Sequence, residues 1–161
     1  MKWPWSRSQE PIEDRPRTHA SARDALQAFQ RGVQFGQEGH TDKALLEFET
    51  AVRLDPNLAQ AHYNRALALR ALGRVDEAVS GFSECIRLKP GPASAAALFK
   101  RAEALTTLNR LEEAVSSYDA FLELHPDYVK ALDDRSVILG ILGRHEEAMR
   151  DKAAIQRLSG A

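Results

Sequence analysis

The sequence predicts an all-α protein, an α-solenoid of four helix–turn–helix repeats, and three observations support this prediction. A short acidic motif ending in alanine recurs at intervals of 34, 36 and 34 residues, with its alanines at Ala44, Ala78, Ala114 and Ala148. A leucine-containing motif ending in proline recurs in the same register, at Pro56, Pro90 and Pro126. A residue that tolerates the left-handed conformation stands five positions before each of those alanines, namely Gly39, Gly73, Asn109 and Gly143.

Each repeat is expected to consist of a helix, a tight turn at the glycine or asparagine, a second helix and a turn marked by proline. The first helix is expected to open with a capping box at Ser21–Asp24. The acidic motifs fall at helix starts, where the helix dipole favours negative charge, so we interpret them as helix caps. The expected helices cover residues 22–38, 42–54, 58–72, 75–88, 94–108, 111–124, 128–142 and 145–158.

Residues 1–20 differ from the rest of the chain, because they show no helical or strand period. They include both tryptophans, Trp3 and Trp5, beside basic residues. We therefore expect a flexible N-terminal tail that acts as a separate binding element, followed by a repeat domain over 21–158. The units of that domain are expected at 25–58, 59–94, 95–128 and 129–158.

Composition excludes several classes of function. The net charge is -1 and the pI about 6.5, so no overall field favours nucleic acid as a partner. The single cysteine, Cys85, and five scattered histidines do not form a metal site. The chain lacks a glycine-rich phosphate loop and any catalytic motif. We expect a cytoplasmic protein that is not an enzyme and has no cofactor.

The repeat resembles the tetratricopeptide repeat, a helix–turn–helix unit of 34 residues. Residues at the family's packing positions are Gly32, Phe35, Ala44, Phe48, Ala51 and Pro56, then Ala66, Leu69, Ala78, Phe82 and Pro90, then Leu98, Ala102, Leu105, Ala114, Tyr118 and Pro126, then Leu132, Ser136, Leu139 and Ala148. The resemblance implies a right-handed α-solenoid that binds a protein or peptide. In the fourth unit Lys152 replaces the aromatic residue, which fits a unit whose outer face caps the stack.

The resemblance also implies a concave groove, lined by the first helix of each unit at positions 2, 5, 6, 9, 12 and 13. Position 5 is an aromatic residue in the first three units, which suggests an exposed contact row with no role in the core. The alternative is that helix packing half-buries these rings. The predicted groove residues are Phe29, Tyr63, Asn64, Phe99, Lys100 and Asp133.

Some family members hold the C-terminal carboxylate of a chaperone with five polar groups. Only Asn64 and Lys100 match that clamp, whereas Phe29, Val33 and Ala96 do not, so the resemblance argues against this ligand.

Four arginines occupy position 7, where the family prefers leucine: Arg31, Arg65, Arg101 and Arg135. Their stems are expected to pack in the stack while the guanidinium groups reach acids, with Glu47 and Asp151 as partners in the first and last units. An alternative is that the row contacts an anionic ligand.

Three functions are therefore open. The leading hypothesis is an adaptor, scaffold or assembly factor that binds a partner peptide or helix in the groove. A second is a structural component tethered to a membrane through Trp3 and Trp5. A third is binding of an anion or nucleic acid through the arginine row. The sequence does not identify the partner or the oligomeric state.

Overall fold

A computed structural model describes residues 19–90 and 94–160 of this chain. Within those ranges the fold is all-α, without a strand. Its helices are α1 (His19–Gln37), α2 (Thr41–Leu54), α3 (Ala59–Ala71), α4 (Val75–Leu88), α5 (Ala95–Thr107), α6 (Leu111–Leu124), α7 (Val129–Ile141) and α8 (His145–Ser159). The expected helices are confirmed, and only the start of the first differs by more than one residue.

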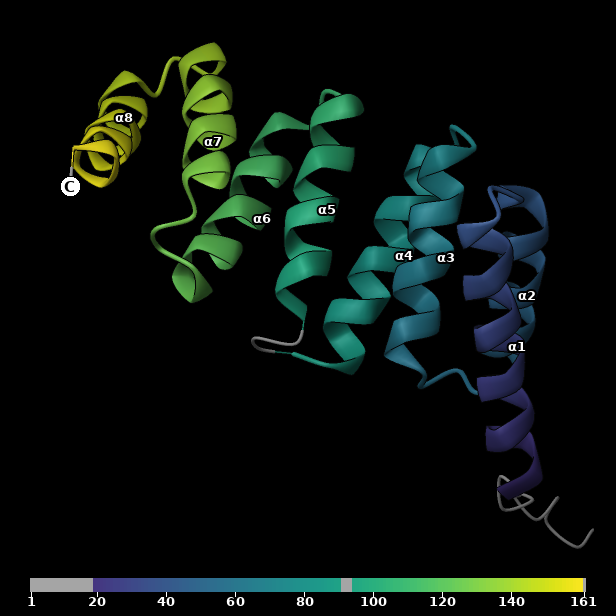
Figure 1. The fold of residues 1–161 in the computed structure, drawn as a ribbon. Coiled ribbons are helices and arrows are strands. Elements are labelled where there is room, and N and C mark those ends of the chain that lie inside the picture. The colour runs from purple at the N-terminus through teal and green to yellow at the C-terminus, as the bar shows by residue number, and fades with distance from the viewer. Residues whose placement is uncertain (1–18, 91–93, 161) are drawn as a thin grey trace, which may run out of the picture.

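The helices stack in chain order into an elongated α-solenoid (Figure 1). Within each unit the two helices pack on each other, as α1 does on α2 and α3 on α4. The second helix of each unit then packs on the first helix of the next. Because each unit contacts mainly its neighbours, the apolar core is a continuous layer along the stack.

The tight turns within the units use the predicted left-handed residues. The φ angles are 79° at Gly39, 78° at Gly73, 56° at Asn109 and 75° at Gly143. This conformation lets the amide of the next residue, three positions beyond the end of each helix, bond back to a carbonyl near that end. The amide of Arg74, for example, donates to the carbonyl oxygen of Leu69 over 2.9 Å.

The acidic motifs lie in the first turns of α2, α4, α6 and α8, as predicted, but they do not cap the helices through their side chains. The N-cap residue of three of these helices is an arginine that forms a two-pronged ion pair with a glutamate three residues on. These pairs are Arg74–Glu77, Arg110–Glu113 and Arg144–Glu147. The capping-box prediction is wrong, because α1 already includes His19 and Ser21 lies inside it.

Gly81 in α4 lies close against the backbone of α3. A Cβ atom built on it would lie 2.9 Å from the Cβ of Ala66 and 3.4 Å from the carbonyl oxygen of His62. Small residues at this crossing therefore set the distance between the two helices.

Replacing Gly81 with alanine is expected to lower the free energy of unfolding by about 1–3 kcal/mol, because a methyl group would overpack this crossing. Gly140 in α7 is a matched control, since nothing lies within 4 Å of the position that a methyl group would take there. Gly140→Ala should stabilise by about 0.5–1 kcal/mol through helix propensity. Urea titrations of both variants measure the difference, and equal effects would contradict close packing at Gly81.

The last helix has the polar character expected of a cap. Its buried residues are Ala148 and Asp151, and Lys152 is exposed at the position where earlier units place an aromatic ring. The predicted tail residues Trp3 and Trp5 lie outside the described residues. Within the described part of the chain, no helix is both long and apolar enough to cross a membrane.

Candidate functional site

A groove of about 580 Å³ lies between α5 and α7, with α3 at its edge. Charged side chains from three successive first helices face it, and α7 adds an apolar wall. Val137 and Ile141 on that wall are 56% and 67% exposed. The lining residues are Arg70, Lys100, Glu103, Thr106, Tyr118, Lys130, Asp134, Val137, Ile138 and Ile141.

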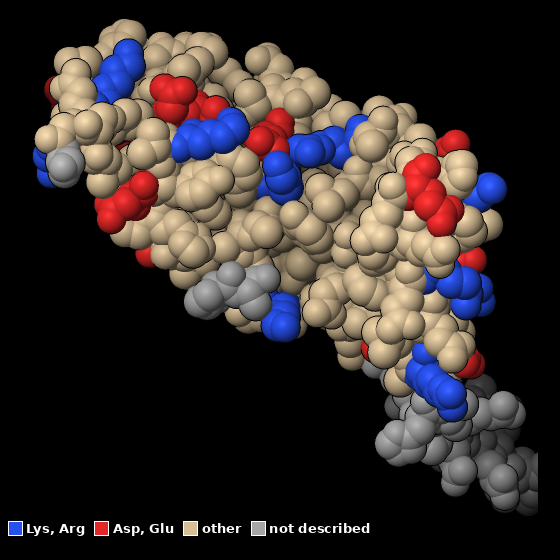
Figure 2. All heavy atoms as spheres, viewed as in Figure 1, with Lys and Arg blue, Asp and Glu red and all other residues tan. Residues whose placement is uncertain are grey.

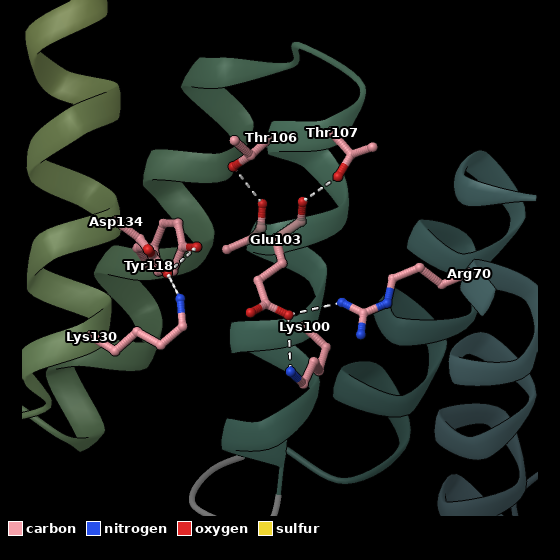
Figure 3. Close-up of polar contacts among 9 residues, drawn as sticks. Arg70, Lys100, Glu103, Thr106, Thr107, Tyr118, Lys130 and Asp134 are labelled. Atoms are coloured by element: carbon pink, nitrogen blue, oxygen red, sulfur yellow. Dashed lines mark hydrogen bonds and ion pairs between the residues drawn. The ribbon is translucent and has the colours of Figure 1, made fainter. Parts of the chain in front are cut away.

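Two ion-pair clusters organise the charged part of this groove (Figure 3). Glu103 accepts hydrogen bonds from Arg70 Nη1 at 2.8 Å and from Lys100 Nζ at 2.9 Å, both on one carboxylate oxygen. On the other side Asp134 accepts from Lys130 Nζ at 2.7 Å and from the Tyr118 hydroxyl at 3.2 Å. The first cluster holds two cations and one carboxylate, so it carries an excess positive charge.

The environment favours the charged forms of Glu103 and Lys130 and the neutral form of Tyr118. Burial raises the pKa of Glu103, but the hydrogen bonds from Lys100 and Arg70 outweigh it, so that pKa lies below its usual range. The hydrogen bond to Asp134 raises the pKa of Lys130. Burial, followed by the nearby Asp134 charge, raises the pKa of Tyr118, whose hydroxyl therefore stays protonated as a donor. The groove thus offers fixed charges of both signs.

The predicted aromatic row is only partly exposed, which corrects the expectation that its rings have no role in the core. Each ring packs against an aromatic residue of the second helix in its own unit. The centroid distances are 5.9 Å for Phe29–Phe48, 5.7 Å for Tyr63–Phe82 and 5.8 Å for Phe99–Tyr118. Phe99 is buried, at 7% exposure, whereas Phe29 and Tyr63 are half-buried. In the fourth unit the equivalent residues, Asp133 and Lys152, are both exposed.

The other predicted groove residues are placed along the same side of the stack. Asn64 donates from its amide to the Gln60 carbonyl oxygen over 2.9 Å and lines a second hollow, of about 360 Å³, between α1 and α3. Lys100 belongs to the larger groove, while Asp133 is exposed but does not line it.

The two outer arginines of the row pair with carboxylates of this chain. Arg31 and Arg135 bind the predicted partners, Glu47 at 2.7 Å and Asp151 at 2.6 Å. Arg135 also contacts Asp119 at 2.6 Å.

The two central arginines of the row have no carboxylate partner within 4.0 Å in the described structure. Arg101 donates from Nε to the Ser117 hydroxyl over 3.2 Å, and burial lowers the pKa of its guanidinium. Arg65 Nε is buried without a hydrogen-bond partner in the same part of the chain. Within the described residues, the arginines of the row without an ion-pair partner are therefore the two at its centre.

Two kinds of reactive site, a metal site and an activated cysteine, are not found among the described residues. No group of three or more His, Cys, Asp and Glu side chains there could hold a metal ion. Cys85 is buried, and burial raises the pKa of its thiol, which keeps it in the unreactive protonated form.

The repeat geometry agrees with comparison to known families. A family model of the tetratricopeptide repeat matches residues 29–91, 82–129 and 99–157. The chain belongs to the tetratricopeptide repeat family.

The curated relatives that this chain matches differ widely in length. An uncharacterised protein of Methanocaldococcus jannaschii is 46% identical over 50 residues, which are 31% of this chain and 58% of that one. The human mitochondrial import receptor subunit TOM70 is 35% identical over 69 residues, 43% of this chain and 11% of TOM70. The chain therefore spans only part of these relatives.

Among solved structures, MamA shares the fold with a TM-score of 0.79 at 17% identity, over 88% of this chain and 81% of that chain. The first tetratricopeptide domain of Spaghetti (RPAP3), solved with an HSP90 peptide, has a TM-score of 0.70 at 26% identity. That match covers 76% of this chain and 95% of that chain.

Sequence reasoning missed the charged groove residues Arg70, Glu103 and Lys130 and the apolar wall residues Val137 and Ile141. In tetratricopeptide numbering they occupy positions 12, 9, 2, 9 and 13, all of which the family directs into the groove. The repeat position of each residue therefore indicated a place in the groove. Which of these residues form the site depended on contacts between units, such as the Arg70–Glu103 pair, whose members are 33 residues apart.

Proposed function

We propose that this chain is an adaptor or assembly factor that holds a segment of another protein in its concave groove, around α5 and α7. The segment lies along the first helices of the units, with apolar side chains on α7 and polar groups at the two ion-pair clusters. The chain contributes binding surface and no chemical step.

The observation behind this proposal is the pairing of exposed apolar side chains with fixed charges in one groove. Val137 and Ile141 leave their side chains in water although the stack has a well-packed core beside them. Exposed apolar residues rimmed by polar groups are typical of protein-interaction sites. On the face shown in Figure 2, acidic and basic side chains lie close together, which offers hydrogen-bonding groups of both kinds.

The RPAP3 domain supports a peptide as the ligand, because it was solved with the HSP90 peptide SRMEEVD. In this chain the family's carboxylate clamp is incomplete, since Val33 and Ala96 cannot bind a carboxylate. A free C-terminus is therefore not required of the partner, and an internal segment fits the groove equally well.

Replacing Ile141 with glutamate is expected to weaken partner binding about tenfold or more, because it puts a charge on the apolar wall. Ligands for the measurement come from a random peptide library displayed against the full-length protein. Fluorescence anisotropy with the selected peptides gives the affinities.

Met149→Glu is the matched control, because Met149 in α8 is 65% exposed and is not among the residues that line the groove. Its affinity for the selected peptides should stay within about twofold. The proposal fails if no peptide is selected, or if both variants bind the selected peptides as the unaltered protein does.

A further inference from the structure

Two smaller apolar pockets lie side by side next to the charged groove, and Ala96 separates them. The first, of about 180 Å³, is lined by Ala59, Gln60, Tyr63, Cys85, Lys89, Ala96 and Ala97. The second, of about 340 Å³, is lined by Ala95, Ala96, Phe99, Lys100, Phe121, His125 and Tyr128. Lys100 also lines the charged groove, so the pockets and the groove form one continuous surface.

The pockets are open because Ala96 is short. Position 2 of the other units carries a longer side chain, namely Leu26, Gln60 and Lys130. Ala96 is exposed on α5, and its short methyl group covers neither the pocket lined by Tyr63 nor the pocket lined by Phe99. We call this surface the Ala96 notch, consisting of the residues that line the two pockets.

Aromatic packing makes the wall of the notch rigid. The Phe99 ring lies 5.2 Å from Phe121 and 5.5 Å from Tyr128, measured between centroids. Phe121 and Tyr128 in turn lie 5.1 Å apart, edge to face. Such a cluster presents both ring faces and ring edges, which favour another aromatic side chain over an aliphatic one.

Among the described residues, the charged side chains that line the notch are Lys89 and Lys100. Lys100 also pairs with Glu103 of the charged groove, in the cluster that carries an excess positive charge. A third lysine, Lys130, places its Nζ 5.6 Å from the Phe99 ring centroid. Lys89 forms no ion pair within the described residues, so it can pair with a ligand without first losing a partner.

We propose that the Ala96 notch binds a large aromatic side chain of a partner protein, flanked in that partner by acidic residues. The inference rests on the proposed function and specifies the chemistry of the partner segment. The aromatic ring enters beside Phe99 and Tyr128, and the flanking carboxylates face Lys89 and Lys100. The tail of this chain fits less well, because Lys2 and Arg7 flank its tryptophans and have the same charge as the notch.

The test uses three capped, fluorescein-labelled peptides and the full-length protein. The probe is Gly-Asp-Glu-Asp-Trp-Glu-Asp-Glu-Gly, compared with one peptide in which alanine replaces tryptophan and one in which lysine replaces every acid. Fluorescence anisotropy should show the probe binding at least about tenfold more tightly than either comparison peptide. Its affinity should fall as the salt concentration rises.

Variants of the protein locate the binding. Ala96→Trp fills the notch and should weaken the probe about tenfold or more, whereas Ala153→Trp, at an exposed alanine of α8, should leave it unchanged. If Ala96→Trp loses its helical circular dichroism and so does not fold, the Lys89→Glu variant tests the binding site instead. This charge reversal at an exposed residue should weaken the acidic probe and strengthen the lysine peptide.

Three results overturn the inference. In the first, the acidic probe does not bind while library-selected peptides still bind and depend on Ile141, which leaves the proposed function intact. In the second, the lysine peptide binds more tightly than the acidic probe. In the third, the protein is a dimer that dissociates on Ala96→Trp or on removal of residues 1–18, which would make a second copy the occupant. Failure of every peptide, selected ones included, would overturn the proposed function as well.

Discussion

Replacing Arg135 with methionine is expected to lower the free energy of unfolding by about 3 kcal/mol. The Arg135 side chain is 20% exposed and that of Asp151 only 5%. Arg135 donates to both carboxylate oxygens of Asp151, at 2.9 and 2.6 Å. Methionine keeps the apolar stem but leaves the buried Asp151 carboxylate without its counter-charge, and an uncompensated buried charge is strongly destabilising. Urea unfolding followed by circular dichroism measures the change.

The first repeat offers the matched control for this effect. Arg31 forms the equivalent pair with Glu47, but its side chain is 52% exposed. Arg31→Met should therefore leave the urea midpoint nearly unchanged, because water already screens a surface ion pair. The double variant Arg135→Met/Asp151→Leu should recover most of the loss, because it removes both charges. Equal losses in the two single variants would contradict a burial effect.

Replacing Phe82 with alanine is expected to destabilise the stack by about 3–5 kcal/mol, since the side chain is fully buried. Its ring belongs to the continuous core and packs against the half-buried Tyr63 ring of the same unit. The resulting cavity interrupts the continuous apolar layer, so the units on either side should also lose cooperativity. Thermal and urea unfolding measure the lower stability and a broader transition.

Leu46→Ala is the control for Phe82→Ala, because it also truncates an apolar residue of a second helix. Leu46 is 64% exposed in α2, so this change should cost less than about 0.5 kcal/mol. A small effect in both variants would mean that the second unit does not depend on the Phe82 ring.

Local patterns were sufficient to predict the helices and turns. The turns at Gly39, Gly73, Asn109 and Gly143 follow from residues that adopt positive φ, and they end the helices where expected. The first helix was the exception, because a capping motif at Ser21 favoured a start that the chain does not use. Residues on either side of a capping motif can also adopt a helical conformation, so the helix can begin before the motif. A capping box therefore locates a helix end less reliably than a turn residue that recurs in every repeat.

The site was predicted less completely than the fold. The rings at position 5 were predicted to be exposed contacts, but Phe99 is buried. The exposure of Phe99 depends on the Tyr118 ring of the second helix, which packs against it. It also depends on the neighbouring rings of Phe121 and Tyr128. Those neighbours lie 19 to 29 residues away in the sequence, so no periodicity along the first helix reveals them.

By itself the sequence determined the repeat register and, from it, the ion pairs between positions 7 and 23 of the first and last units. These pairs are Arg31–Glu47 and Arg135–Asp151, and both join the same two positions of a unit. Only the tertiary structure decided the contacts between units, such as Arg70 with Glu103, and the opening beside Ala96. The physical reason is that a repeat fixes its own helix pair through local packing, whereas the stacking of successive units depends on all the side chains at their interface.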